Sequence, residues 1–324
     1  MESIAKKNAN SVLASRFIKK YFNLEFLKKV IWSIVRAVLI IGIAYIIMAP
    51  LLTKIAASFM TEKDVWSASV RWIPENFTLD NYKDVFQRMV YPKAFMNSLL
   101  LTTTVSLLQL ASCTFVGYGF ARFDFKGKKI IFALVIFTLI VPPQVTMIPL
   151  YLNFRYFDLF GLIKEPGINM IGSFWPFIFM AVTAVGLKNG IFIYIMCQFF
   201  KGMPSSLEEA AYVDGAGPIR TFYKVMLPGA VPALVTVFLF AFVWQWNDYF
   251  YTSMFMGEAT LLPVTLAFLN GGRFGSEDLN TSGRVIVHIY NNTGMLMFIA
   301  PLLLLYTFMQ RYFIESIERT GLVG

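Results

Sequence analysis

The chain has 324 residues, of which 57% are hydrophobic and only 15% are charged, and its mean hydropathy is +0.62. A soluble domain needs more charge than this to cover its surface, so the composition excludes an ordinary soluble protein. The net charge of +9 does not require a nucleic-acid partner, because basic residues that flank membrane segments explain it.

The first 29 residues form a polar, basic segment, which we expect to lie in the cytoplasm. Its basic residues are Lys6, Lys7, Arg16, Lys19, Lys20, Lys28 and Lys29. A first apolar stretch follows without a small-residue cleavage site, so we do not expect a cleaved signal peptide. Arg36, near the inner end of that stretch, can snorkel to the lipid headgroups.

Long uncharged runs alternate with short charged segments from about residue 30 onward. A bilayer core of roughly 30 Å requires about 20 apolar residues in a helix, and most of the runs are that long. They are too long and too continuous for the strands of a membrane barrel. We therefore predict an all-α, polytopic membrane protein with about six transmembrane helices, at 30–52, 95–118, 130–150, 174–200, 228–253 and 288–311.

Lysine and arginine are concentrated between alternate spans. The connection "ARFDFKGKK" after the second span carries Arg122, Lys126, Lys128 and Lys129, whereas basic residues in the opposite loops are more dilute. This bias places both termini and the segment 201–227 in the cytoplasm. On the outer side we expect two structured loops, Trp72–Phe86, with a helix cap at Thr78 or Asp80, and Leu261–Gly283.

Lys188 interrupts the fourth span near its middle. A charge at mid-bilayer costs about 2.5–3.5 kcal/mol on insertion scales, so such residues usually face protein or a water-filled path. With Asn189 and Gly190, Lys188 marks a helix break or lines a cavity. The alternative is that the span is shifted and Lys188 lies at a membrane interface.

A polar hairpin, "SSLEEAAYVDGAGPIRTFYKV", separates the fourth span from the fifth. Ser205 or Ser206 can cap a first short helix. Glu208 and Glu209 then fall in its opening turn, where the helix dipole favours negative charge.

The same hairpin has a turn at its centre. Gly215 and Gly217 end the first helix, and Pro218 suits the first turn of a second helix that runs to Leu227. Ala210 and Ala211 leave a small-residue face that another surface can approach. These residues alone leave two interpretations open, a docking feature and an ordinary connecting loop.

Aromatic and polar residues gather towards the outer end of the fifth span, as Trp244, Gln245, Trp246, Asn247 and Asp248. Sugars bind to such clusters, because aromatic faces stack on them and polar groups bond their hydroxyls. The alternative is an interfacial aromatic belt with a structural hydrogen bond. His288, Cys113 and Cys197 are interpreted as structural, and "GGRFG" lacks the lysine and hydroxyl residue of a phosphate loop.

The hairpin resembles the EAA signature of ATP-binding cassette (ABC) importer permeases. The residues that match the signature, at the spacing of the signature, are Glu209-Ala210-Ala211, Gly215, Val225 (where isoleucine is usual) and Leu227-Pro228. The extended "EEAAYVDGAG" is similar to the carbohydrate branch, the maltose-permease-like family. The stretches "NFTLDNY", "YGFARFDFKGK", "WNDY" and "QRYFIESIERTGLVG" agree, so the resemblance covers most of the chain from about residue 30.

The resemblance implies a type I ABC importer transmembrane fold over residues 30–324, with a coupling helix at about 205–217 that sits in a cleft of an ATPase. The coupling residues would be Glu208, Glu209, Ala210, Ala211, Asp214 and Gly215. The implied partners are a second homologous permease, a cytoplasmic ATPase dimer and an extracytoplasmic sugar-binding protein, in the bacterial cytoplasmic membrane. The chain itself would be neither an enzyme nor a cofactor carrier, because ATP and Mg²⁺ would bind the ATPase.

We therefore predict a permease subunit of an ATP-driven carbohydrate (oligosaccharide) importer that forms half of the translocation path. The candidate path residues are Lys188, Trp244, Asn247 and Asp248. One alternative is an ABC importer permease for another polar solute. A second is an ion-driven secondary transporter, which predicts internal repeats and functional intramembrane carboxylates and needs no EAA hairpin. A membrane scaffold without transport activity explains none of the spacing.

Overall fold

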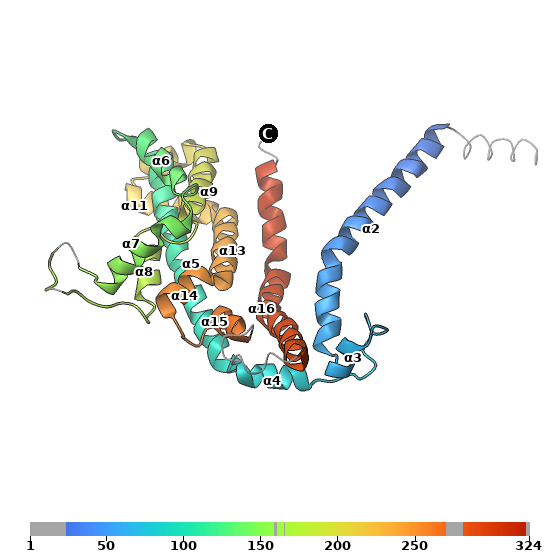
Figure 1. Ribbon diagram of the computed structural model, residues 1–324. Helices are drawn as coiled ribbons and strands as arrows, with labels where there is room; N and C mark the ends of the chain where they lie inside the picture. The colour runs from blue at the N-terminus through green and yellow to red at the C-terminus, as the bar shows by residue number, and fades with distance from the viewer. Residues whose placement is uncertain (1–23, 159–160, 165, 270–280, 322–324) are drawn as a thin grey trace, which may run out of the picture. The chain divides into compact units, whose positions relative to one another are not determined.

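The computed structural model describes residues 24–158, 161–164, 166–269 and 281–321, and the chain divides into two compact units, Met1–Thr78 and Leu79–Gly324 (Figure 1). All regular elements among the described residues are helices, and the only β pairing there is one isolated bridge between Phe157 and Ile168. The all-α prediction is thus confirmed for these residues. Most of the basic segment 1–29 and part of the predicted loop Leu261–Gly283 lie outside them.

The first unit contains helix α2, Leu24–Ser58, and the short helix α3, Glu62–Trp66. The apolar part of α2, Phe26–Ser58, is long enough to cross a membrane, and none of its most apolar window is buried within the chain. A helix that exposes apolar side chains on all sides suits hydrocarbon and not water.

After α2 the chain folds back around the buried carboxylate of Asp64. Its Oδ2 accepts hydrogen bonds from the backbone N–H groups of Asn76 at 3.0 Å and Thr61 at 3.3 Å, and its Oδ1 accepts one from the Asn76 side chain at 2.8 Å. The rings of Phe59 and Phe77 stack beside this turn at 5.0 Å. Burial raises the pKa of Asp64, but the hydrogen bonds from Asn76 and Thr61 outweigh burial and hold the pKa below its ordinary value of 3.8.

Asp64→Asn is expected to loosen the segment 61–78. The folded-state pKa lies below the unfolded value, so the carboxylate stabilises the fold above about pH 4, and this contribution is lost as pH falls through the folded pKa. The amide, which cannot carry the charge, should reproduce the acid state at pH 7. Hydrogen-exchange mass spectrometry should show several-fold faster exchange in peptides covering 61–78, with the exposed Glu75→Gln as control. Unchanged exchange in Asp64→Asn would contradict the assignment.

The second unit is built around helix α5, Tyr91–Arg122, which packs against α8, α9 and α13. Its other helices are α4 (Asp80–Arg88), α6 (Lys128–Phe137), α7 (Pro143–Arg155), α8 (Trp175–Val182), α9 (Asn189–Gly202), α10 (Ser206–Val213), α11 (Pro218–Thr221), the π-helical turn η1 (Phe222–Met226), α12 (Leu227–Gly229), α13 (Val231–Asn247), α14 (Phe250–Met256), α15 (Leu262–Ala267) and α16 (Thr281–Gly321). Helix α4 begins after Leu79 without a side-chain cap, so the predicted cap at Thr78 or Asp80 is wrong.

Three helices are long and apolar enough to cross a membrane, at Phe26–Ser58, Tyr91–Arg122 and Val285–Gln310. They correspond to the first, second and sixth predicted spans. The fifth corresponds to Pro218–Gly229 and Val231–Asn247, which qualify only together and are bent by 77°. The described residues therefore contain three or four candidate spans.

The third and fourth predicted spans are each divided into two shorter helices. Pro142 and Pro143 stand at the start of α7, where proline cannot continue a preceding helix. Between α8 and α9, Ala184 and Lys188 adopt left-handed backbone conformations with φ of 56° and 62°. The arrangement of six spans with both termini in the cytoplasm therefore stays a prediction.

The closest helix packing in the second unit is between α5 and α9. A Cβ atom at Gly117 of α5 would lie 2.6 Å from Cβ of Met196 and 3.0 Å from the backbone N of Cys197 on α9. Cys113 and Cys197 are free and buried in this core, as expected for packing residues. Close approach of helix backbones at small residues is a common means of association in membranes.

Candidate functional site

Helix α10 forms the first half of the polar hairpin, and its C-terminus is closed by Gly215. Gly215 has a φ of +77°, and its N–H donates to Tyr212 O at 3.0 Å while Ala216 N–H donates to Ala211 O at 2.9 Å. These two bonds define a Schellman motif, which needs a residue that tolerates the left-handed conformation. Ser205 stands at the N-cap position, but its side chain makes no capping hydrogen bond, so the predicted serine cap is wrong.

The two faces of α10 have different surroundings. Glu208 and Ala211 are buried against the rest of the chain, at 8% exposure each. The opposite side is exposed and comprises Leu207, Glu209, Ala210, Tyr212 and Val213, which we call the outer face. The predicted small-residue face is thus divided, since Ala210 points outward and Ala211 inward. Asp214 and Gly215 are also exposed.

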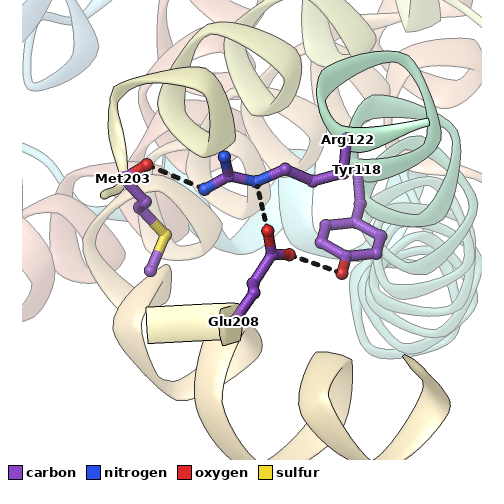
Figure 2. Close-up of polar contacts among 4 residues, drawn as sticks. All are labelled: Tyr118, Arg122, Met203 and Glu208. Carbon is purple, nitrogen blue, oxygen red and sulfur yellow. Dashed lines mark hydrogen bonds and ion pairs between the residues drawn. The ribbon is translucent and has the colours of Figure 1, made fainter. Parts of the chain in front are cut away.

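Glu208 is held by two residues from the C-terminal end of α5 (Figure 2). Tyr118 Oη donates a hydrogen bond to Glu208 Oε1 at 2.7 Å, and Arg122 Nε lies 3.1 Å from Glu208 Oε2. Arg122 and Glu208 therefore form an ion pair, but the Nε–H group is not aligned for a hydrogen bond. Arg122 Nη2 also donates to Met203 O at 2.8 Å. We call Tyr118, Arg122 and Glu208 the α5–α10 joint.

The ion pair of the joint is largely shielded from solvent, with side-chain exposures of 15% for Arg122 and 11% for Glu208. Removal of one partner from a buried pair typically destabilises by about 3–5 kcal/mol, because it leaves the other charge uncompensated. The sequence prediction treated Arg122 only as a topology signal and did not identify Tyr118. Their spacing of one helical turn, which places both on one face of α5, was the only signal available.

Aromatic rings from α9 and η1 pack against the Tyr118 ring of the joint. The Tyr118 ring lies 4.7 Å from that of Phe222 on η1 and 5.2 Å from that of Phe200 on α9. Phe115 of α5 adds a further contact to Phe222 at 5.1 Å. The ends of α5 and α9 and the turn η1 therefore meet beside α10.

The second half of the hairpin starts with Pro218 in the first turn of α11, as predicted, whereas Gly217 is the N-cap of α11 and does not end the first helix. The chain stays helical through Leu227, as predicted, and on to Gly229. The chain passes through the π-helical turn η1 and the short helix α12, and then bends by 77° into α13. The predicted helix to Leu227 is therefore confirmed, with a π-helical turn inside it.

Side chains of α5 support the break between α8 and α9. Gln109 Nε2 donates to Leu187 O at 3.1 Å and lies 2.7 Å from the side-chain amide of Asn189, and Ser112 Oγ donates to Ala181 O at 2.6 Å. These side chains satisfy backbone groups that the break removes from helical hydrogen bonding. Gln109 lies 13 residues before Arg122, so the break is about 20 Å along α5 from the joint.

Lys188 stands at this break as the residue that precedes α9, and its side chain is exposed. Asn189 and Gly190 are buried behind it. A cavity beside the break is lined by residues that include Gln109 and Gln245 and has a volume of about 10 Å³. This is room for one water molecule and not for a sugar.

The structure does not bring Trp244, Asn247 and Asp248 together as one site. Trp244 stacks with Phe192 at 5.5 Å and with Phe240 at 5.7 Å. Asn247 donates to the backbone of its own helix, at Val243 O. The geometry here favours the structural alternative.

Asp248 is buried at the start of α14. Its Oδ1 accepts from Tyr251 N–H at 3.2 Å, and its Oδ2 accepts from the N–H and hydroxyl of Thr252 at 2.9 and 3.0 Å. Both carboxylate oxygens are therefore used to hold the first turn of α14. In the part of the chain that the structure describes, no three His, Cys, Asp or Glu side chains gather as metal ligands would.

Comparison with known proteins assigns this chain to a protein family. Residues 114–319, more than half of the chain, match the family described as "Binding-protein-dependent transport system inner membrane component". The chain belongs to this family. It is therefore a non-catalytic permease of the inner membrane, and the resemblance found in the sequence is confirmed.

Several relatives of this permease align over most of both chains. It is 33% identical to the "Osmoprotective compounds uptake permease protein GgtD" of Synechocystis sp. over 86% of this chain and 88% of the relative. It is 29% identical to the "Arabinooligosaccharides transport system permease protein AraQ" of Halalkalibacterium halodurans, over 87% and 93%. It is 28% identical to the "Polygalacturonan/rhamnogalacturonan transport system permease protein YtcP" of Bacillus subtilis, over 84% and 91%.

The fold of the permease also matches a solved structure. This is the "Crystal structure of a bacterial ABC transporter involved in the import of the acidic polysaccharide alginate", with a TM-score of 0.72 at 22% sequence identity, over 88% of this chain and 98% of that chain. The fold is therefore that of an ABC importer permease. As a component of a binding-protein-dependent ABC system, the permease works with an ATPase and a binding protein.

Proposed function

We propose that this permease imports a carbohydrate as one of two homologous membrane subunits, and that it docks an ATPase dimer through the hairpin at 205–217. Relatives named for arabinooligosaccharide and polygalacturonan transport support the substrate class. A relative named for osmoprotective compounds, at 33% identity, favours a second candidate, a small polar osmoprotectant.

The observation that carries the docking proposal is the exposed outer face of α10. Val213 is 88% exposed and Tyr212 45% exposed, although both are large side chains that would gain from burial. The C-terminus of the helix is fixed by the Schellman motif, so this surface is presented in a defined orientation. A cleft in the ATPase would cover it, and closure of the ATPase on ATP would then move α10.

The six-span topology remains part of this proposal, with α6 and α7, and likewise α8 and α9, each crossing the membrane as a broken pair. Gln109 and Ser112 support it, because they satisfy backbone groups beside the break at the depth of mid-α5. We keep Lys188 as the candidate path residue, since an exposed charge at that depth requires water or protein around it. Trp244, Asn247 and Asp248 are retained only as structural residues.

Reconstitution tests the function directly. The permease, purified from its host with its partner permease, ATPase and binding protein, should support ATP-dependent uptake of labelled oligosaccharides in proteoliposomes. Uptake of a small osmoprotectant in place of any oligosaccharide would establish the second candidate. Uptake without ATP would indicate an ion-driven carrier and overturn both.

Val213→Asp is expected to release the ATPase. A carboxylate placed in the covered centre of an interface must be desolvated without a partner, which costs several kcal/mol. Purification through a tag on the permease should then recover the partner permease but little ATPase. Val213→Ile, which keeps an apolar side chain, is the control and should retain it. An ATPase that stays bound to Val213→Asp would rule out docking through this face.

A further inference from the structure

The α5–α10 joint is separate from the outer face of α10, and its residues point in the opposite direction. Both carboxylate oxygens of Glu208 are occupied by Tyr118 and Arg122 (Figure 2), so Glu208 is not available to an ATPase. Its neighbour Glu209 is exposed. Adjacent residues of a helix point about 100° apart, and the two glutamates therefore serve different surfaces.

We propose that the α5–α10 joint carries movement of the hairpin into the membrane, so that Tyr118, Arg122 and Glu208 are positioning residues for transport. This inference rests on the proposed docking of α10 to the ATPase. It concerns a different step, because docking requires the outer face alone, whereas transmission requires the inner face to move α5.

The chain on either side of α10 makes such a joint necessary. The helix spans only Ser206–Val213 and connects through short turns, one at Pro204 and the other at Gly215. An isolated helix of this length is not stable in water, so contacts on its inner face are needed to hold it under load. Without contacts on its inner face, a push on α10 would turn the helix about these connections and would not move the membrane helices.

Arg122 joins three elements at one point. Its guanidinium contacts Glu208 of α10 and the carbonyl of Met203 at the end of α9, while its own backbone belongs to α5. A planar guanidinium, unlike the flexible ammonium of lysine, has N–H groups in fixed directions, and here the hydrogen bond to Met203 O sets its orientation beside Glu208. The partly buried setting strengthens the pairing relative to one in water. Displacement of α10 therefore moves the cytoplasmic ends of α5 and α9 together.

The connection from the joint to mid-membrane is continuous along α5. Gly117, next to Tyr118, holds α5 directly against the backbone of α9. Further along, Gln109 bonds the non-helical backbone between α8 and α9, where Lys188 is exposed. Movement of α5 along its axis would therefore reach the break that carries the candidate path residue.

The test measures solute uptake per ATP hydrolysed by the complete transporter in proteoliposomes, after assembly has been checked by co-purification. Arg122→Gln and Glu208→Gln, examined separately, should retain the ATPase but lower uptake per ATP by about tenfold, because each leaves a buried charge without its partner. The exchanged pair Arg122→Glu with Glu208→Arg should recover part of the loss. Lys128→Gln removes the exposed pair with Asp124 at 3.0 Å and should have no effect.

Wild-type uptake per ATP in both single variants would overturn the inference. So would an exchanged pair whose uptake per ATP is no higher than that of Arg122→Gln or Glu208→Gln. If the charge variants fail to assemble, Tyr118→Phe decides, because it removes one hydrogen bond and keeps the ring. Normal uptake per ATP in an assembled Tyr118→Phe transporter would then make the joint purely structural. Docking is judged separately, by retention of the ATPase in Val213→Asp.

Discussion

Gly117→Leu is expected to prevent recovery of a stable transporter, and Gly117→Ala is expected to weaken the transporter. A Cβ atom there would lie 2.6 Å from Cβ of Met196, 3.0 Å from the backbone N of Cys197 and 3.2 Å from Ile193 O. Two of these three atoms are backbone, so no rotamer change relieves the clash and α5 must move away from α9. Overpacking of this kind typically costs about 1–3 kcal/mol, and the larger leucine should cost more.

Gly119 provides the matched control on the same helix. A Cβ atom at Gly119 would have no neighbour within 4 Å, so Gly119→Ala should be neutral or slightly stabilising, since alanine is favoured over glycine in a helix by about 1 kcal/mol. The same substitution should therefore lower stability at position 117 and not at position 119. The measurement is the thermal unfolding midpoint of the purified complex in detergent. Equal midpoints for Gly117→Ala and Gly119→Ala would contradict close α5–α9 packing.

Hydropathy predicted the long helices because their signal is local. The helices α2, α5 and α16 contain the first, second and sixth predicted spans, since an uncharged run of sufficient length has few alternatives to a spanning helix. Hydropathy did not predict the divided spans, although Lys188 with Asn189 and Gly190 indicated a helix break as one interpretation, and this break is confirmed. The break before Lys188 depends on Gln109 and Ser112, which come from a helix some 70 residues earlier in the chain.

The candidate site was also predicted only where its signals are local in the sequence. Helical periodicity separates Glu208 from Glu209 by about 100°, but it does not say which of them faces inward. That choice is made by Tyr118 and Arg122, which are distant in sequence. The cluster at Trp244–Asp248 was suggested by composition alone, and Asp248 proves to be engaged by the N–H groups of α14. The turn at Gly215 was predictable, because glycine at a helix end indicates a left-handed residue.

Gly215→Pro is expected to abolish transport while the permease still inserts into the membrane. Proline fixes φ near −65°, whereas residue 215 has a φ of +77°, and proline also lacks the N–H that Gly215 donates to Tyr212 O. Asp214, with ψ of 5°, is in a conformation that is disfavoured before proline. These conflicts together should cost at least about 3 kcal/mol, enough to unwind the end of α10 and redirect its outer face.

The measurement is ATP-dependent uptake, with membrane content of the permease determined in parallel. Gly217→Ala is the control, because Gly217 has a φ of −76° and a Cβ atom there would meet nothing within 4 Å. We expect wild-type uptake in the control and background uptake in Gly215→Pro, at equal membrane content. Because Gly215 lies outside the joint as well as outside the predicted spans, normal uptake in Gly215→Pro would mean that the orientation of α10 is not used for coupling. The hairpin would then be only a connection between membrane segments.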